Sequence, residues 1–307
     1  MRVLVLGSSG VAGRSTVRTL ANAGHRVSAH VRSLPASERV RALGGTPVFA
    51  DVEDDQALRA CLLGVDAVVD LRSAVPHGNR AVLGTAWRDY ARLRGKELGR
   101  VVDCALATGV GRVVRDTVTV VYADGGNRVL TETAPVGARG ALAANLQAEE
   151  HVRRLTQAGG VGVALRMAPF YGPDDVISKE LLQAADEGQA RVVGDVQGWT
   201  SALHTDDVGP AVLAALAAPA GVYNVADSVP LRRGEWIGLL AASAGRSELR
   251  RPPRMLQRMV AAPVAALSRS HRVSAAAFTA ATGWKPTVPD RREGWPAAAA
   301  RLHGALR

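Results

Sequence analysis

The chain opens with an apolar segment, a glycine-rich turn and a helix-like segment, and this order constrains the fold more than any other feature. Residues 2–6 form an apolar run typical of a buried parallel strand. Val17, Leu20 and Ala21 then recur at helical spacing, up to Gly24 at the position of a helix C-cap. The turn between the two segments consists of Gly7, Ser8, Ser9, Gly10, Val11, Ala12 and Gly13. This succession predicts a nucleotide-binding unit rather than an ordinary glycine-rich surface loop.

The spacing of the glycines indicates which part of a nucleotide the turn binds. Gly7, Gly10 and Gly13 form the pattern G-x-x-G-x-x-G, a variant of the dinucleotide-binding motif. Glycines permit a tight turn and a close approach of the backbone, and the amides of the following helix point at a pyrophosphate. We therefore expect the seven turn residues to contact the pyrophosphate of a dinucleotide cofactor.

The end of the second expected strand, residues 26–31, indicates which dinucleotide is preferred. An acidic residue about twenty positions beyond the glycines would bind the ribose 2′-hydroxyl of NAD. No acid occurs between Gly13 and Glu38, and Arg32 and Ser33 stand there instead. Because a guanidinium can hold a 2′-phosphate through two hydrogen bonds, we expect NADPH (NADP+) to be preferred over NADH. The alternative is that Arg32 is only a solvated surface residue.

The strong positive charge does not by itself predict a nucleic-acid partner. The net charge is +10, but the arginines are scattered and only three lysines occur, Lys96, Lys179 and Lys285. The densest basic stretch, residues 246–258, is interpreted as a solvated face rather than as a site for an acidic ligand. We therefore expect a small-molecule substrate and no nucleic acid.

Cysteine usage and hydropathy indicate the cellular setting. Cys61 and Cys104 both lie in apolar helical patterns, as expected for core residues of a reduced cytosolic protein. The chain begins directly with a strand, so no signal peptide is expected. No run of eighteen apolar residues occurs, so no membrane span is expected. We expect a cytoplasmic protein; no metal site is predicted, and the oligomeric state is left open.

Strand and helix signals alternate along the first two thirds of the chain. Expected strands cover residues 2–6, 26–31, 46–50, 66–71, 112–118 and 161–167. Expected helices cover residues 56–63, a long segment ending near 107, and 141–158. This alternation predicts an α/β fold with a Rossmann-type doubly wound parallel sheet. We expect an NADP-binding domain over 1–165, with a returning segment near 200–225, and a smaller mixed α/β substrate lobe over 166–307.

Several motifs in order along the chain resemble those of one known family. The chain resembles the extended or atypical short-chain dehydrogenases/reductases, of the NAD-dependent epimerase/dehydratase type, nearly from end to end. The matching segments are 7–13, Asp51-Val52, Val121-Tyr122, Leu165-Arg166, Tyr171-Gly172-Pro173, 203–208, 221–225 and 283–286.

The resemblance implies roles for individual residues around the cofactor. Thr117 would lie near the nicotinamide ribose, and His204 is expected to be a packed, hydrogen-bonded histidine rather than a catalytic one. The adenine would be flanked by Asp51 and Val52, the cofactor lined beyond the fourth strand by Leu71, Arg72 and Ser73, and the nicotinamide bordered by Pro169, Phe170 and Tyr171.

The catalytic pair of the resembled family is missing. In that family a tyrosine four residues before a lysine transfers the proton, and the lysine lowers the pKa of the phenol and holds the ribose. Ala141 stands where the tyrosine belongs and Asn145 where the lysine belongs. Val118 falls at the place of the family's serine or threonine, between Thr117 and Thr119.

No other tyrosine of the chain restores this motif. The four tyrosines are Tyr90, Tyr122, Tyr171 and Tyr223, and the residues four positions later are Arg94, Gly126, Asp175 and Asp227. Three explanations remain open. Another polar residue donates the proton, with Ser73, Thr117 and Tyr122 as candidates; the substrate carries its own acid; or the protein binds NADP(H) without catalysis.

We predict a reductase of the ketoreductase type. The expected reaction is NADPH-dependent reduction of a polycyclic aromatic ketone, of the angucyclinone type found in antibiotic biosynthesis, by direct hydride transfer. The alternatives are a protein that senses NADP(H) and a sugar-nucleotide epimerase or dehydratase. Ser73 is a candidate substrate contact, and the apolar walls of the pocket could come from Trp87, Tyr122, Phe170, Tyr171 and Trp199, each of which could instead be a core residue.

Overall fold

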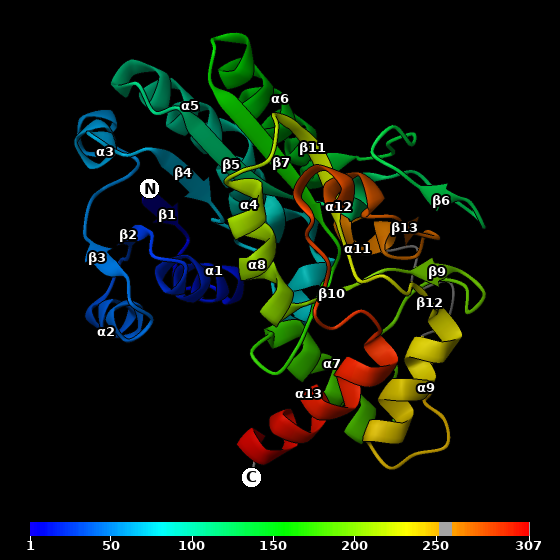
Figure 1. Ribbon diagram of the computed structural model, residues 1–307. Coiled ribbons are helices and arrows are strands. Elements are labelled where there is room, and N and C mark those ends of the chain that lie inside the picture. The colour runs from blue at the N-terminus through cyan, green and yellow to red at the C-terminus, as the bar shows by residue number, and fades with distance from the viewer. Residues whose placement is uncertain (252–259, 307) are drawn as a thin grey trace.

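A seven-stranded parallel sheet forms the centre of the molecule (Figure 1). The computed structural model describes residues 1–251 and 260–306. The strand order is β11-β7-β5-β4-β1-β2-β3. The strands are β1 (Arg2–Leu6), β2 (Arg26–His30), β3 (Thr46–Val48), β4 (Ala67–Asp70), β5 (Arg112–Val118), β7 (Val161–Met167) and β11 (Gly221–Val225). The predicted α/β class with a Rossmann-type doubly wound sheet is confirmed.

The strands read as continuous apolar runs because both faces of the sheet are buried. In β1, Val3 and Val5 belong to one core cluster, whereas Leu4 and Leu6 belong to a second. The first cluster is covered by α1 (Val11–Asn22), α2 (Leu34–Ala42), α8 (Thr205–Ala215) and α12 (Ala276–Thr282). The second is covered by α3 (Asp55–Leu62), α5 (Lys96–Thr108) and α6 (Ala143–Gln157).

Besides shifts of one or two residues at the ends of other elements, three elements differ from the sequence-based expectation. Helix α2 was not predicted; Ser33 is its N-cap, accepting a hydrogen bond of 3.4 Å from the amide of Ala36. The long helix before residue 107 is divided at Gly95 into α4 (Arg88–Arg94) and α5. Strand β3 ends at Val48, two residues before the expected end.

The second half of the chain contributes both to the sheet and to a separate lobe. Strand β11 pairs in parallel with β7, so the chain returns to the sheet after residue 220. The remaining small strands form the pairs β8 (Phe170–Tyr171) with β10 (Leu203–His204), β9 (Trp199–Thr200) with β12 (Leu231–Arg232), and β6 (Val129–Leu130) with β13 (Arg272–Val273). We retain the division at residue 165 as a proposal.

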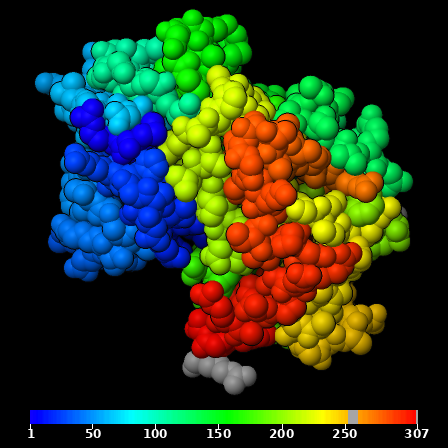
Figure 2. Space-filling view, viewed as in Figure 1, coloured from blue at the N-terminus to red at the C-terminus, as the bar shows by residue number. Residues whose placement is uncertain are grey.

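The lobe has its own apolar core. Trp236 and Trp295 meet edge to face, with ring centroids 4.7 Å apart, inside a cluster that also contains Tyr171. Its main helices are α7 (Val176–Asp186), α9 (Arg233–Ser243) and α13 (Arg291–Leu306). In Figure 2 the red and orange C-terminal segment lies across this face, beside the yellow segment that carries α8 and β11. Among residues 1–251 and 260–306, no helix combines the length and apolarity needed to cross a membrane.

A glycine allows α8 to pack closely on α1, the helix that follows the glycine turn. A Cβ atom on Gly209 would lie 2.3 Å from Oγ1 of Thr19 and 2.4 Å from the carbonyl oxygen of Ser15. The amide of Gly209 also donates a hydrogen bond of 3.0 Å to the Ser15 hydroxyl. Backbone contact at this point fixes the position of α1 relative to the second half of the chain.

We expect Gly209→Ala to lower the free energy of unfolding by about 1–3 kcal/mol, because the added methyl group overpacks the contact between the two helices. Gly238→Ala in α9 is the matched control, since a Cβ there would meet nothing within 4 Å. That change should raise the free energy of unfolding by about 0.5–1 kcal/mol through helix propensity. Urea unfolding measures the free energy of unfolding of both variants. Changes of the same sign would contradict the close helix contact assigned to Gly209.

Candidate cofactor site and the adjoining catalytic positions

The glycine turn is pressed against the end of β4. Gly7 has a φ of +80°, and a Cβ atom there would lie 2.7 Å from the backbone of Leu71 and Arg72. A Cβ atom on Gly13 would lie 2.1 Å from the carbonyl oxygen of Gly7. The amide of Gly10 donates a hydrogen bond of 3.2 Å to that same oxygen. The turn is therefore too tight for any side chain at its first and last glycines.

The turn leaves backbone amides available for an anion. Helix α1 begins after Gly10 without a side-chain cap and without an acidic residue in its first turn. The buried Ser8 hydroxyl donates a hydrogen bond of 2.6 Å to the carbonyl of His30, which braces the turn against β2. Free amides and the positive end of the helix dipole suit a pyrophosphate, so the residues present fit a dinucleotide cofactor.

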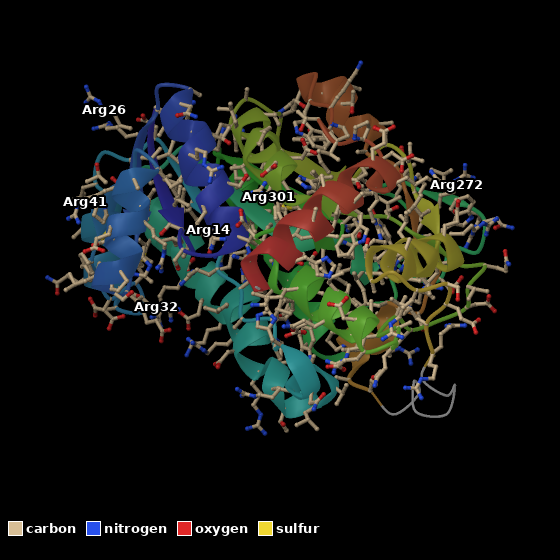
Figure 3. The ribbon with its side chains drawn as sticks, turned by 90° about the horizontal axis from the view of Figure 1, so that it is seen from below. Arg14, Arg26, Arg32, Arg41, Arg272 and Arg301 are labelled. Atoms are coloured by element: carbon tan, nitrogen blue, oxygen red, sulfur yellow. The ribbon has the colours of Figure 1, made fainter. Side chains whose placement is uncertain are left out.

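The region expected to contact the adenosine half contains both exposed and structural residues. The guanidinium of Arg32 is exposed and forms no hydrogen bond or ion pair with the described residues. In Figure 3, Arg32 is labelled at the lower left of the molecule and Arg26 at the upper left. Asp51 is exposed and accepts a hydrogen bond of 2.9 Å from the amide of Glu53, while Val52 is buried in the core.

A buried charge network stands at the end of β4. The guanidinium of Arg72 contacts the Asp70 carboxylate through two hydrogen bonds of 3.0 and 2.8 Å. Arg115 of β5 approaches Oδ1 of Asp70 to 2.9 Å and donates to the carbonyl oxygens of Asp70 and Arg72. Burial raises the pKa of Asp70, but the two arginines outweigh it and hold that pKa at about 2. Because its side chain is bonded to Asp70, Arg72 offers a cofactor mainly its backbone. Of its two neighbours, Leu71 is buried and Ser73 is exposed.

Thr117 and Tyr122 have their hydroxyl groups engaged inside the protein. The Thr117 hydroxyl donates a hydrogen bond of 3.3 Å to Glu149 of α6. The fully buried Tyr122 donates 2.7 Å to Oδ1 of Asn224 and accepts 2.9 Å from Arg166. Tyr122 therefore braces β5 against β7 and β11, and it presents neither a free hydroxyl proton nor an exposed ring to a substrate. Thr117 is likewise fully buried, which leaves Ser73 as the exposed member of the three candidate donors.

The aromatic residues expected in one pocket wall fall into different clusters. Trp87 is buried beside Tyr90, whereas Phe170 packs on the main core. Tyr171 is buried in the core of the C-terminal lobe, edge-on to His204. Trp199 is half-buried, and the guanidinium carbons of Arg232 and Arg272 lie 3.9 and 4.8 Å from the centroid of its ring. The structure does not bring the five residues into one cluster, and Trp87 remains near the catalytic positions.

The positions of the missing catalytic pair are apolar or internally bonded. Ala141, just before α6, is half-buried and packs against the cluster of Trp87, Tyr90 and Ala261. Asn145 is fully buried, and its amide nitrogen donates hydrogen bonds of 3.0 Å to the hydroxyl of Tyr90 and to the carbonyl oxygen of Leu142. The sequence marks Tyr90 only as a tyrosine without a lysine four residues later, whereas the fold brings its hydroxyl to Asn145 of α6.

His204 has the surroundings of a structural residue. Its Nδ1 accepts a hydrogen bond of 3.2 Å from the amide of Asp206 at the start of α8. Burial lowers its pKa, with the nearby carboxylates acting in the opposite direction. A mostly neutral, buried histidine that caps a helix has no evident part in proton transfer.

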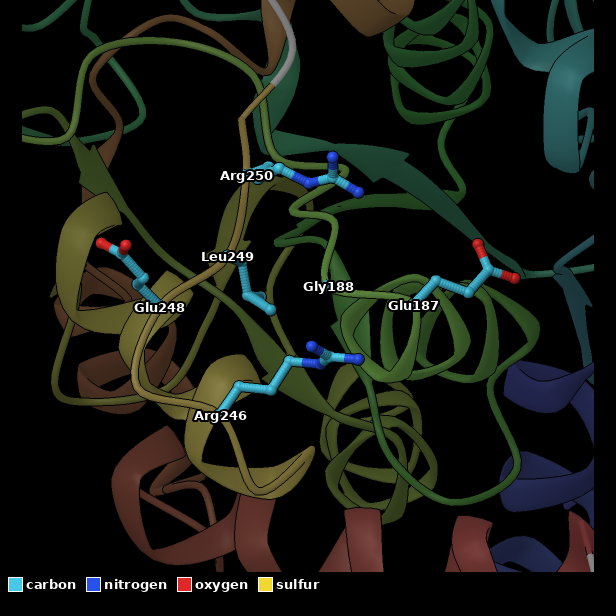
Figure 4. A pocket seen from close by; sticks show the side chains of 6 residues that line it. All are labelled: Glu187, Gly188, Arg246, Glu248, Leu249 and Arg250. Atoms are coloured by element: carbon cyan, nitrogen blue, oxygen red, sulfur yellow. The ribbon is translucent and has the colours of Figure 1, made fainter.

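A surface hollow of about 510 Å³ lies far along the chain from the glycine turn (Figure 4). Its lining comes from the end of α7 and from the segment after α9, and includes Arg246, Glu248 and Arg250. These arginines belong to the basic stretch 246–258, of which residues 252–258 lie outside the described part of the chain. The hollow shares no lining residue with the candidate cofactor site.

The sheet and the glycine turn define a Rossmann-type dinucleotide-binding protein. Residues 3–226 match the NAD dependent epimerase/dehydratase family, and the chain belongs to this family. It is 31% identical to a 3-diazoavenalumate denitrifying reductase of a Streptomyces species, over 96% of this chain and 99% of that protein. It is 30% identical to a 4-hydroxy-2-methyl-3-oxo-4-farnesyl-3,4-dihydroquinoline-1-oxide ketoreductase of Stigmatella aurantiaca, over 80% and 74% of the two chains. The chain is accordingly an NAD(P)-dependent oxidoreductase.

Solved structures show the same fold at lower identity. The structure of MoeE5 in complex with UDP-glucose and NAD superposes with a TM-score of 0.81 at 21% identity, covering 100% of both chains. The dTDP-glucose 4,6-dehydratase DesIV from Streptomyces venezuelae, with NAD and TYD bound, gives a TM-score of 0.82 at 22% identity, covering 99% of this chain and 97% of that one. At this identity the likeness establishes the fold alone.

Two glycine substitutions separate the folding of the turn from its contact with the cofactor. Gly13→Ala should lower both the melting temperature and the affinity for NADPH, because its Cβ would collide with backbone atoms. At Gly10 a Cβ would meet only the Gly7 carbonyl at 3.5 Å, an ordinary contact. Gly10→Ala should therefore keep the melting temperature and still weaken NADPH binding about tenfold or more, since its methyl group blocks the pyrophosphate. Thermal unfolding and fluorescence titration measure the two effects; unchanged NADPH affinity in Gly10→Ala would place the pyrophosphate elsewhere.

Proposed function

We propose that this oxidoreductase is an NADPH-dependent ketoreductase acting on a polycyclic aromatic ketone of the angucyclinone type. The observation that carries the proposal is a turn that fits the cofactor, together with catalytic positions occupied by Ala141 and by the internally bonded Asn145. The ketoreductase relative supports the reaction type. When bound, NADPH supplies a hydride to the carbonyl carbon, and the residues of the chain hold and orient the ketone.

The missing tyrosine favours reduction over sugar-nucleotide chemistry. An epimerase or dehydratase of this family begins by removing a proton from a sugar hydroxyl, which requires a general base at the tyrosine position. Ala141 has no group that accepts a proton. A ketone that carries an adjacent phenol needs less from the protein, because its own hydroxyl group stabilises the developing alkoxide through an intramolecular hydrogen bond.

A second candidate reaction is the reductive removal of nitrogen from an aromatic diazo group. The relative that is aligned over 96% of this chain is named a denitrifying reductase. Hydride addition to the ring carbon of an aryl diazonium ion releases dinitrogen and leaves an aryl C–H bond, so the step consumes no proton. The absence of the Tyr/Lys pair would then not slow this reaction. A non-catalytic NADP(H)-sensing protein is the third possibility, and the substrate panel below separates the three.

We expect Arg32→Ala to raise the dissociation constant of NADPH on the order of tenfold and to leave that of NADH nearly unchanged. The reason is the loss of a guanidinium that would contact the 2′-phosphate, a contact found only with NADPH. Arg26→Ala at the opposite end of β2 is the matched control and should change neither constant. Fluorescence titration gives both dissociation constants. Equal effects of Arg32→Ala on the two cofactors would contradict a contact between Arg32 and the 2′-phosphate.

A panel of acceptors tests the reaction. Oxidation of NADPH, followed by its absorbance, should occur with polycyclic ketones that carry an adjacent phenol and more slowly with ketones that lack it. Oxidation of NADPH by an aryl diazo compound alone, with release of dinitrogen, would favour the second candidate. Tight NADPH binding without oxidation by any acceptor would favour the sensing protein and contradict both reactions.

A further inference from the structure

Tyr90 of α4 contacts Asn145 of α6 and lies in the cluster against which Ala141 packs, where the resembled family has its catalytic tyrosine. Its hydroxyl accepts a hydrogen bond of 3.0 Å from Nδ2 of Asn145 and donates a longer one of 3.3 Å to Oδ1 of the same side chain. Asn145 stands at the lysine position of the resembled family. A tyrosine hydroxyl is therefore present beside the missing pair, although it comes from another helix, 55 residues earlier in the chain.

A second contact links Tyr90 to the position of the absent tyrosine itself. Tyr90 forms a small apolar cluster with Trp87 and Ala261, and Ala141 packs against this cluster. The rings of Trp87 and Tyr90 meet edge to face with centroids 5.2 Å apart. Because Ala141 ends at its methyl group, the space that a tyrosine would need on α6 is left to residues from other segments.

A third contact supplies a fixed positive charge. The guanidinium of Arg94, one helical turn beyond Tyr90, lies 4.6 Å from the centroid of the Tyr90 ring. Arg94 is buried and forms an ion pair of 2.8 Å with Asp116, directly before Thr117 and Val118 at the end of β5. Burial lowers the pKa of Arg94, but Asp116 outweighs it and keeps this side chain charged.

We propose that Tyr90 is the proton donor for ketone reduction by this protein, with Asn145 and Arg94 as positioning residues. The inference rests on the proposed function. As the carbonyl carbon gains a hydride, the π electron pair moves to oxygen. This oxygen takes the proton of the Tyr90 hydroxyl, whose hydrogen bond of 3.3 Å to Oδ1 of Asn145 breaks in the step and is longer than the 2.7 Å bond that holds the Tyr122 proton. The products are an alcohol, NADP+ and a phenolate, which the Asn145 amide and the Arg94 guanidinium stabilise until water returns a proton.

The surroundings of Tyr90 also indicate the kind of ketone that reaches it. Tyr90 is 2% exposed, whereas Val75, Ala141 and Val264, which pack against its cluster, are only half-buried. The Tyr90 side chain is therefore buried in a cluster whose outer members are half-buried apolar side chains. A substrate that displaces these outer side chains must itself be apolar where it touches the cluster, as a fused aromatic ketone is.

Tyr90→Phe, assayed on two ketones, tests the donor. On a ketone without an adjacent phenol, kcat should fall about 10²–10⁴-fold while the dissociation constant of NADPH stays unchanged. On the matching hydroxyaryl ketone the loss should be much smaller, because the substrate supplies the hydrogen bond. Tyr223→Phe, at a tyrosine whose hydroxyl donates to the Pro219 carbonyl, is the control and should change neither rate. Equal losses on both ketones, or no loss, would overturn the proposal.

The positioning role of Asn145 has a separate readout. Asn145→Leu removes the N–H group that contacts the Tyr90 hydroxyl, so kcat should fall on the ketone without an adjacent phenol and much less on the matching hydroxyaryl ketone. A loss of stability alone would lower kcat equally on the two ketones. Equal losses on both ketones in an active Asn145→Leu variant would overturn the role of Asn145.

Fluorine NMR makes the test independent of turnover. The chain has four tyrosines, so protein labelled with 3-fluorotyrosine should give four lines, and Tyr90→Phe identifies one of them. Addition of NADP+ should shift the Tyr90 line and leave the Tyr223 line in place. An unshifted Tyr90 line in a protein that reduces ketones would overturn this inference alone. A wild-type protein that reduces no ketone would instead overturn the proposed function, whatever the spectrum shows.

Discussion

The buried ion pairs around Asp70 are the interaction on which the arrangement of the site depends. Arg72 and Arg115 satisfy this carboxylate at the end of β4, where both faces of the sheet are apolar. An unpaired charge at this depth would cost several kcal/mol, so the three side chains fix one another. The backbone that they hold, at residues 71–72, is the surface against which Gly7 turns, and the position of the cofactor turn follows from it.

The sheet could be predicted from the sequence because its signal is local. Strands β1, β5 and β7 have the expected bounds, since two buried faces produce uninterrupted apolar runs. The charge network could not be predicted, because Asp70 and Arg115 are far apart in the chain and each reads as a solvated residue within its own segment. Helix α2 was missed because its cap, Ser33, was interpreted only as a possible cofactor contact.

The candidate site also has one part that the sequence predicts and one part that it does not. The glycine turn is one contiguous motif, so its residues and their role could be named directly from the sequence. The catalytic positions could be described only by what they lack, because the family's pair is a local motif of two residues four apart. The contact between Tyr90 and Asn145 joins two helices, and no periodicity or spacing in a single segment reports such a pair.

The neutral side chain of Asn145 has a consequence for how long the cofactor stays bound. An epimerase returns to the substrate the hydride that it removed, so it gains from retaining one cofactor molecule through many cycles. A reductase must exchange its spent cofactor after each cycle. With Asn145 turned inward to Tyr90 and Leu142, α6 at this position offers no cation to the nicotinamide ribose. Retention of the cofactor would then depend on contacts at its pyrophosphate and adenosine ends, which would favour exchange after each cycle.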